Sequence, residues 1–446
     1  MPECYFAVEK SQPLRGTVEL AGAKNAALVA IAALLLTRGV SQLGSIPASS
    51  DVEQMMMLLE HLGARVFFDR TAGVLTVDTS NLVQAQIPAA IMSRMRASIL
   101  VMGPLLSRFS SVTMAKPGGC LIGSRPIDFH LKGFKKMGIA IFEDGEKITA
   151  TMTPEATRET ERRVVLEYPS VGATENLMML ALSLPGTTSI INASLEPEVL
   201  DHISLLRKMG ANIEYVVPQT LVIVGGIALN PVNHHDIIPD RLEAGAILLA
   251  AAITKGSVTI TNGRPYDMDV FLEKLREMGH SITTHGESGI TLVACNDPKA
   301  VSIKTAPHPG FPTDLQAPLM AAVCVARGEA VFEETVFENR LMHVRELQKM
   351  GAQIEVTGSR ARIRGVEKLY SADVIATDIR ASCSLVLAGL AASGCTRMSG
   401  VAHWRRGYDQ LEHKLTTMGA RIKLVANRAE WADLSGKAVD SLKPLT

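Results

Sequence analysis

The sequence predicts an α/β protein built from six copies of one supersecondary unit of about 70 residues. The first observation is a recurring segment in which an amphipathic stretch ends in Leu or Met, then Gly, and continues as a strand-like stretch. By subtraction these glycines lie 75, 72, 69, 72 and 68 residues apart, at Gly63, Gly138, Gly210, Gly279, Gly351 and Gly419. A fixed period of this size indicates one structural unit used repeatedly.

Each of these glycines is expected to be the residue that ends a helix. That position often requires positive φ, which only Gly adopts without steric cost.

The second observation is an apolar run in each unit. The runs are rich in Ala, Leu, Val and Met on all sides, which is typical of a buried helix, and they are too short to span a bilayer. They are Ala26–Leu36, Ala97–Leu106, Glu175–Leu184, Ala244–Thr254, Leu315–Ala326 and Ala381–Ala392. Most run into a Gly before the next strand, whereas the second is followed by Arg108, Phe109 and Ser110.

An amphipathic helix and strands complete each unit, and this alternation predicts the α/β class. Ser50 and Glu53 have the Ser-x-x-Glu spacing of a capping box that would open a helix over Asp51–Leu62. A chain of 446 residues is too long for one core, so six units divide most simply into two domains of three. A ligand is then expected in the cleft between the domains.

Composition excludes several classes of function. The formal net charge is zero and aromatic residues make up 4%, which argues against a nucleic-acid-binding surface. The six cysteines include no C-x-x-C pair, so no zinc or redox motif is expected. Cys324 and Cys383 fall in apolar runs and are interpreted as core residues. The N-terminus lacks the pattern of a secretory signal, and we expect a cytoplasmic protein without a membrane span.

Cys120 is the cysteine with a setting suited to chemistry. It lies between Lys116 and Pro126 in a segment with three glycines and two prolines, which predicts an irregular loop. Lys116 and Arg125 flank the thiol, and nearby cations stabilise a thiolate. Cys120 is therefore a candidate acid, base or nucleophile on a mobile lid, with an exposed structural turn as the alternative.

Cations recur where helices are expected to start: Lys24 with Asn25, Arg96, Arg380, and Arg405 with Arg406, while Arg340 follows a loop. A cation opposes the helix dipole at an N-terminus, but a bound anion is attracted by both. The set therefore suggests an anion-binding cleft, although any single member can be a solvated surface residue.

Asp314 opens the fifth apolar run, after a proline-rich stretch. It can be an N-cap or a positioned general base, and the residues alone leave both interpretations open.

The chain resembles the UDP-N-acetylglucosamine 1-carboxyvinyltransferase family of enolpyruvyl transferases, in order from about residue 6 to 425. The motifs that carry the resemblance are Ala21–Ala27, Arg96–Ser98, Pro117–Pro126, Ser170–Thr174, Pro239–Glu243, Thr305–Asp314, Glu334–Arg340 and Arg406–Tyr408. The resemblance implies a two-domain inside-out α/β barrel with domains at 24–237 and at 1–23 plus 238–427, and an extension over 428–446.

The implied reaction transfers the enolpyruvyl group of phosphoenolpyruvate to the 3-hydroxyl of UDP-N-acetylglucosamine, the first committed step of peptidoglycan synthesis. No metal or cofactor is implied, and partner proteins are unknown. By resemblance, Cys120 is the general acid and the fosfomycin target, and Asp314 takes the hydroxyl proton; Lys24 and Arg406 complete the catalytic set. Phosphoenolpyruvate would be bound by Lys24, Asn25, Arg125, Arg380 and Arg406. UDP-N-acetylglucosamine would be bound by Arg96, Arg125, Pro126, Ile127, Asp128, Phe129, Tyr168, Pro169, Ser170, Val171, Asp314 and Val336.

The chain departs from the family pattern at two places. No lysine occurs over residues 47–50, and Arg405 stands where some relatives have Asp. Three alternatives remain: the shikimate-pathway enolpyruvyl transferase, a non-catalytic UDP-sugar-binding regulatory paralogue, and an enzyme that takes a modified UDP-sugar.

Overall fold

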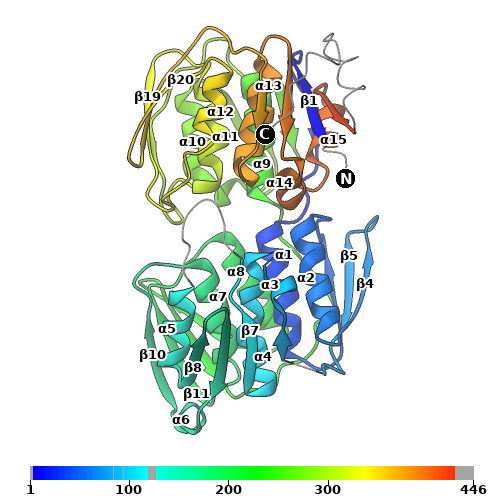
Figure 1. Cartoon of the computed structure of the whole chain (residues 1–446), viewed down its shortest axis with the longest axis vertical. Helices are drawn as coiled ribbons and strands as arrows, with labels where there is room; N and C mark the ends of the chain where they lie inside the picture. The colour runs from blue at the N-terminus through cyan, green and yellow to red at the C-terminus, as the bar shows by residue number, and fades with distance from the viewer. Residues whose placement is uncertain (1–3, 84, 94, 119–126, 427–446) are drawn as a thin grey trace. The chain divides into compact units, whose positions relative to one another are not determined.

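The computed structural model describes residues 4–83, 85–93, 95–118 and 127–426. Its contacts divide these residues into two compact units. Unit I contains residues 21–118 and 127–238, and unit II contains residues 4–20 and 239–426. Figure 1 shows the chain coloured from one end to the other, with the helices and strands of each unit labelled.

Each unit contains three four-stranded sheets, each with one parallel pair at an edge and two antiparallel pairs. In unit I the sheets are β14(His235–Asp236)-β3(Val40–Gly44)-β5(Val74–Asp78)-β4(Arg65–Asp69), β6(Gln86–Ile87)-β7(Ser111–Ala115)-β9(Lys147–Met152)-β8(Ile139–Asp144) and β10(Glu161–Val165)-β11(Gly186–Ile191)-β13(Thr220–Gly225)-β12(Asn212–Val216). In unit II they are β2(Arg15–Val18)-β15(Ser257–Ile260)-β17(Ile290–Val293)-β16(Ser281–Thr284), β18(Ile303–Lys304)-β19(Glu329–Glu333)-β21(Arg360–Arg364)-β20(Gln353–Thr357) and β22(Asp373–Ile375)-β23(Cys395–Ser399)-β1(Tyr5–Glu9)-β24(Arg421–Val425).

Three of these sheets are completed by strands from distant parts of the chain. In unit I, β14 pairs with β3, so the last segment of the unit completes its first sheet. In unit II, β2 pairs with β15, and β1 lies between β23 and β24. The repeat period does not predict these pairings, because a period describes each repeat and not the exchange of strands between repeats.

The six apolar runs form helices that are buried on nearly all sides, as predicted. Unit I has α1(Lys24–Ala33) extended by η1(Leu34–Leu36), η2(Arg96–Val101) continued by α4(Met102–Phe109), and α7(Val171–Ala181). Unit II has α9(Arg241–Ile253), α11(Thr313–Val323) and α13(Ile379–Ala391), each of which contacts the other two. Side chains of these helices make up much of the core of each unit.

The remaining helices lie between the strands in sequence. In unit I they are α2(Ser50–His61), α3(Ala89–Met92), α5(Asp128–Lys136), α6(Pro154–Arg158) and α8(Pro197–Lys208). In unit II they are η3(Pro265–Asp267), α10(Asp269–Glu277), α12(Val344–Lys349), α14(Val401–Gly407) and α15(Leu411–Thr417).

The glycine prediction is confirmed at all six positions. Their φ angles lie between 81° and 105°, in the region that side-chain-bearing residues avoid. Ser110, which stands where other repeats have a second helix-ending Gly, is itself left-handed with φ of 58°. The helix end is therefore maintained at Ser110 at some conformational cost.

The capping-box prediction is wrong. α2 begins at Ser50, its N-cap is Ser49, and no side chain caps it. Glu53 forms an ion pair with Arg70 at 2.6 Å and does not return to the helix start. The carboxylate of Asp51 forms an ion pair with Lys24 of α1. Contacts with other parts of the fold therefore determine the partners of the side chains in the first turn of α2.

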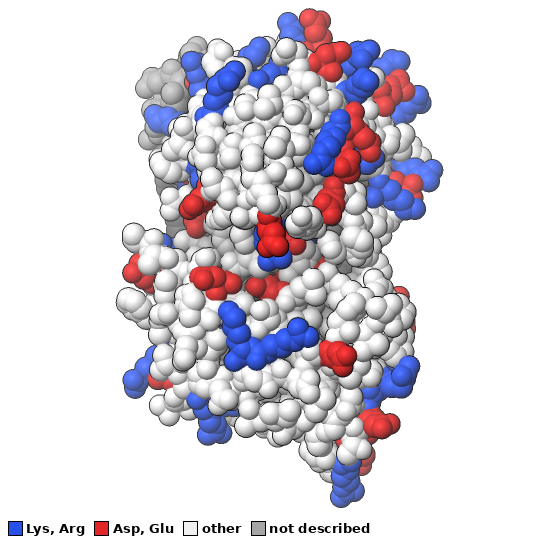
Figure 2. Space-filling view, turned by 180° about the vertical axis from the view of Figure 1, so that it is seen from behind, with Lys and Arg blue, Asp and Glu red and all other residues white. Residues whose placement is uncertain are grey.

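Charged side chains of both signs are spread over the face shown in Figure 2, where one small group of basic side chains stands out in the lower part. This surface agrees with the zero net charge of the sequence. None of the helices in the described ranges is long and apolar enough to cross a membrane.

Candidate active site

Unit II contains a group of charged side chains close to the starts of its buried helices. Asp314 lies in the first turn of α11, where it forms an ion pair with Arg340 through Oδ1 and with Arg380 through Oδ2, the latter at 3.0 Å. The N-cap of α11 is Pro312, without a side-chain cap. The N-cap interpretation of Asp314 is therefore wrong, and its carboxylate joins two cations.

Both arginines are almost fully buried, with 3% exposure for Arg340 and 4% for Arg380. Arg340 Nε and Arg380 Nη1 have no hydrogen-bond partner among the described residues. Buried N–H groups of a cation are costly to leave unpaired. The two groups are therefore suited to an anionic ligand that supplies the missing acceptors.

The starts of the three buried helices meet at this group. Asp240 caps α9 and Asp378 caps α13 by accepting backbone N–H groups, and Asp378 also lies 3.8 Å from Arg340. Burial by itself opposes the charge of Arg380, but the carboxylates of Asp314 and Asp240, with Tyr408, hold its pKa well above the usual value. Arg380 thus remains a cation in a buried setting.

Glu334 connects this group to the loop that carries Val336. The buried Glu334 carboxylate accepts from the Thr313 hydroxyl at 2.9 Å, beside Asp314. Its other oxygen accepts the backbone N–H of Val336 at 2.8 Å. The structure therefore brings Val336 to the start of α11, although the two are well separated in the sequence.

Arg406 is half-buried in the last turn of α14, near His403. The expectation that Arg405 and Arg406 open a helix is therefore wrong, because they lie at the end of one. Arg405 forms an ion pair with Glu412 of α15 at 2.6 Å. The departure from the family pattern at Arg405 is thus accommodated by a local ion pair within unit II.

One of the predicted cations of unit I is Lys24, the first residue of α1. Its Nζ lies 3.1 Å from Asp51 Oδ2, and both side chains are at most 10% exposed. Asn25, the next residue, is exposed. The α1 start has no side-chain cap and no acidic residue in its first turn.

Arg96 is the first residue of η2 and is half-buried. Burial and, to a smaller degree, the charge of Arg96 lower the pKa of His130 to about 3. The side-chain amide nitrogen of Asn176, on α7, lies 3.1 Å from His130 Nδ1. The amide oxygen of Asn176 accepts the Gly103 N–H at 2.8 Å. His130 is therefore a neutral, oriented side chain that joins α5 to α7.

The other predicted nucleotide-sugar residues gather at the starts of α5 and α7. The rings of Phe129 and Tyr168 stack with centroids 6.5 Å apart and an interplanar angle of 18°. Ser170 caps α7 by accepting the Ala173 N–H at 3.4 Å. Ile127, Asp128, Pro169 and Val171 are all half-buried in the same two segments.

Cys120, Arg125 and Pro126 lie outside the described residues. Lys116, one of the two cations expected to act on the thiol, forms an ion pair with Glu143 at 3.1 Å. The five described cysteines form no disulfide with one another, and all belong to unit II. Cys324 and Cys383 are buried as predicted, and burial raises the pKa of their thiols to about 12 and about 11.

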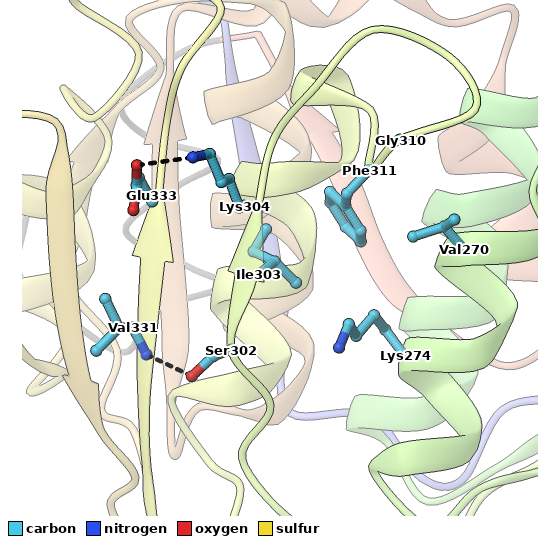
Figure 3. A pocket seen from close by; sticks show the side chains of 9 residues that line it. All are labelled: Val270, Lys274, Ser302, Ile303, Lys304, Gly310, Phe311, Val331 and Glu333. Carbon is cyan, nitrogen blue, oxygen red and sulfur yellow. Dashed lines mark hydrogen bonds and ion pairs between the residues drawn. The ribbon is translucent and has the colours of Figure 1, made fainter.

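Two surface hollows are evident. One, of about 500 Å³, lies in unit II. Figure 3 shows its lining, with Phe311 and Lys274 on one side and the ion pair of Lys304 with Glu333 on the other. No predicted site residue lines it, and Lys274 is paired with Glu277 at 2.8 Å. A hollow of about 270 Å³ in unit I is lined in part by Phe129 and three lysines, so it adjoins the stacked aromatic pair.

Sequence reasoning misses several members of the unit II group. It identifies Arg340 as a cation without assigning it to the site, and it gives no role to Asp378, Glu334 and Tyr408. Arg340 and Glu334 lie in one motif, and Tyr408 lies two residues after Arg406, which is the signal that could have found them. Across the described ranges, no cluster of three or more His, Cys, Asp or Glu side chains is arranged to hold a metal ion.

Comparison with known proteins identifies the family. A family model described as EPSP synthase (3-phosphoshikimate 1-carboxyvinyltransferase) matches residues 8–415. A curated UDP-N-acetylglucosamine 1-carboxyvinyltransferase of Desulfosudis oleivorans is 44% identical over 94% of this chain and 98% of its own length. A relative from Caldanaerobacter subterraneus, named UDP-N-acetylglucosamine 1-carboxyvinyltransferase 1, is 45% identical with the same coverage.

Solved structures agree on the fold. The enolpyruvyl transferase NikO from Streptomyces tendae has a TM-score of 0.85 at 23% identity, covering 95% of this chain and 99% of its own. EPSP synthase from Acinetobacter baumannii has a TM-score of 0.72 at 17% identity, covering 95% of this chain and all of its own. These likenesses confirm the inside-out α/β fold of the enolpyruvyl transferases. With the curated relatives, they show that the chain belongs to the UDP-N-acetylglucosamine 1-carboxyvinyltransferase family of enolpyruvyl transferases.

Proposed function

We propose that this enzyme transfers the enolpyruvyl group of phosphoenolpyruvate to the 3-hydroxyl of UDP-N-acetylglucosamine and releases phosphate. The observation that carries the proposal is 44% identity over 94% of the chain to an enzyme of that name. The two buried arginines with unpartnered N–H groups support it, since both substrates are anions. The reaction is the first committed step of peptidoglycan synthesis and hence serves cell-wall growth, cell shape and division.

The reaction requires a proton to leave the sugar hydroxyl and another to reach phosphoenolpyruvate. The hydroxyl oxygen bonds to C2 while C3 gains a proton, which gives a tetrahedral phospho-ketal. Loss of a proton from C3 then re-forms the double bond as phosphate departs. We assign Asp314 to take the hydroxyl proton and Cys120 to protonate C3, with Lys24, Arg125, Arg380 and Arg406 holding the phosphate and carboxylate.

The ion pairs of Asp314 place a condition on its role as a base. Both carboxylate oxygens are engaged by arginines, and a carboxylate shared by two cations is a weak proton acceptor. An anionic substrate that binds Arg340 or Arg380 supplies a competing acceptor and can release one oxygen of Asp314. Asp314 would then become an effective base only after phosphoenolpyruvate has bound.

The nucleotide sugar is assigned to the half-buried residues of unit I and to Val336. The stacked pair of Phe129 and Tyr168 offers an apolar surface, and the start of α7 offers backbone N–H groups to a diphosphate. Asn25 is assigned to phosphoenolpyruvate beside Lys24. Arg96, Arg125, Asp314 and the segments 126–129 and 168–171 complete the set.

We further propose that the two units are the two three-repeat domains, with a C-terminal extension beyond residue 427. We also propose that the enzyme acts in the cytoplasm, where thiols stay reduced. The five described cysteines, which form no disulfide with one another, support this assignment.

Phosphate release from phosphoenolpyruvate tests the proposal, with UDP-N-acetylglucosamine as acceptor and 3-phosphoshikimate as the control acceptor. We expect release only with the UDP-sugar, and mass analysis should detect its enolpyruvyl ether. Release with 3-phosphoshikimate instead, or with neither acceptor, would refute the proposal. A screen of modified UDP-sugars, such as UDP-N-acetylgalactosamine, should show a preference for UDP-N-acetylglucosamine.

A further inference from the structure

Tyr408 is a buried side chain two residues after Arg406, and the reaction outlined above gives it no role. It is 3% exposed and forms the C-cap of α14. Its ring lies against Arg380, with 5.4 Å between Arg380 Cζ and the ring centroid. Tyr408 and Asp314 therefore both contact the guanidinium whose Nη1 lacks a partner among the described residues.

The Tyr408 ring is itself held in place. The fully buried Trp404 packs against it with centroids 5.0 Å apart, and Phe6 of β1 packs edge-on against Trp404 at 5.6 Å. Trp404 Nε1 donates to Glu412 at 2.7 Å. A chain of aromatic rings with a fixed end leaves Tyr408 little freedom to move away from Arg380.

Gly407 makes this close approach possible. A Cβ atom at residue 407 would lie 2.1 Å from Cγ2 of Ile379, the residue before Arg380. The end of α14 and the start of α13 therefore touch at a point where only hydrogen fits. Any larger residue at 407 would force α14 away from α13 and separate Tyr408 from Arg380.

The hydroxyl of Tyr408 also acts on Arg380, because its interaction with the guanidinium helps to hold the pKa of Arg380 above its usual value. Cys383 lies one turn further along α13, and its thiol interacts with the same hydroxyl. Burial and the adjacent thiol raise the pKa of Tyr408 well above its usual value, so the hydroxyl stays protonated at neutral pH.

We propose that Tyr408 is a positioning residue that fixes the Arg380 guanidinium so that its Nη1 group binds the anion of phosphoenolpyruvate. This inference rests on the proposed function and assigns a residue that acts through Arg380 without contacting substrate. Asp314 engages Arg380 through Nη2, and the Tyr408 ring is a second contact that limits how the guanidinium can move.

The test compares Tyr408→Phe with Tyr5→Phe. Tyr5 is also buried in unit II and also carries an arginine over its ring, with Arg397 Cζ 3.7 Å from the centroid. We expect Tyr408→Phe to raise KM for phosphoenolpyruvate about tenfold, the scale of a lost polar interaction with a charged group. KM for UDP-N-acetylglucosamine should stay unchanged, and Tyr5→Phe should change neither constant.

A second variant and a second readout keep the outcomes separate. Gly407→Ala should raise KM for phosphoenolpyruvate in the same way, with thermal unfolding recorded for all variants. Calorimetric binding of phosphoenolpyruvate measures the same effect without turnover. Wild-type enzyme that releases no phosphate refutes the proposed function. Equal affinity for phosphoenolpyruvate in wild type and Tyr408→Phe, or an equal loss in Tyr5→Phe, overturns the role of Tyr408.

Discussion

The two units use the same buried helices but treat the helix starts in opposite ways. In unit I the first turns of α1, η2 and α7 contain no acidic residue, and the N-cap positions are Ala23, Met95 and Ser170. In unit II, Asp240 and Asp378 cap α9 and α13, and Asp314 lies in the first turn of α11. The same fold therefore presents a different electrostatic field in each unit.

The difference changes the electrostatic environment that each helix start offers to an anion. A helix start carries about half a positive charge, and in unit I no carboxylate of the helix itself opposes it. In unit II carboxylates already compensate the helix starts and the buried Arg340 and Arg380. An anionic ligand of unit II can bind Arg340 Nε and Arg380 Nη1, which lack acceptors among the described residues, and it then shares both arginines with Asp314.

Chemical labelling is expected to show the largest difference in thiol reactivity, between Cys120 and the cysteines of unit II. An epoxide phosphonate of the fosfomycin type should add once, at Cys120, since burial keeps the pKa of Cys324 and Cys383 at about 12 and about 11. Intact-mass analysis should show one adduct that is absent in Cys120→Ser. Cys120→Asp should resist the reagent and retain turnover, because a carboxylic acid can deliver the proton. An adduct on any unit II cysteine would contradict the assignment.

Asp314→Asn is expected to lower turnover by roughly 10²-fold or more, the scale of a lost general base. The free energy of unfolding should also fall, by about 1–3 kcal/mol, because two buried arginines lose a charged acceptor. Asp373→Asn is the matched control, since Asp373 faces the buried Arg397 at 3.8 Å in the same unit. Full activity in Asp314→Asn would contradict the role of Asp314 as the general base.

Lys24 and Asp51 provide a stability test in unit I. Lys24→Ala removes the cation that lies 3.1 Å from the buried Asp51 carboxylate and should cost about 3–5 kcal/mol, together with loss of phosphoenolpyruvate use. The double variant Lys24→Ala/Asp51→Ala should recover most of the stability but not the activity. Arg70→Ala breaks the exposed pair with Glu53 and should cost at most about 1 kcal/mol. A double variant as unstable as Lys24→Ala would show that the pair is not the cause.

Acid should destabilise both units through neutral buried histidines. Burial lowers the pKa of His202 in unit I to about 3 and of His280 in unit II to about 4. The unfolded chain binds a proton near pH 6.5, so stability is complete above that pH and falls as the pH drops toward 3–4. At pH 5 each histidine should cost about 2 kcal/mol.

Urea unfolding of His202→Leu at pH 7 and pH 5 measures this effect for one residue. Its two ring nitrogens lack partners among the described side chains, so the apolar variant loses no hydrogen bond to them. The variant should lose less stability than wild type between the two pH values. An identical loss in both proteins would show that His202 does not contribute.

The repeat, the buried helices and the helix-ending glycines follow from the sequence alone. These features are local, since a helix buried on all sides is apolar throughout and positive φ selects Gly within a single residue. The cations at the helix starts are also visible in the sequence, and the motifs around them carry the resemblance to the family. The Ser50–Glu53 signal fails because Asp51 is recruited by Lys24, which lies in another helix.

The partner of each of these residues is selected by long-range packing. β1 and β2 complete the sheets of unit II from the other end of the chain, and a period of about 70 residues contains no information on such pairing. An Asp at position 314 fits the sequence pattern of an N-cap and that of a general base equally well. Its position between Arg340 and Arg380 in the structure distinguishes it from a cap. Tyr408 lies in one motif with Arg406, but only the structure shows its contact with Arg380. Contacts between distant segments and the burial they produce set the energies of charged side chains, and they leave no mark on the local sequence.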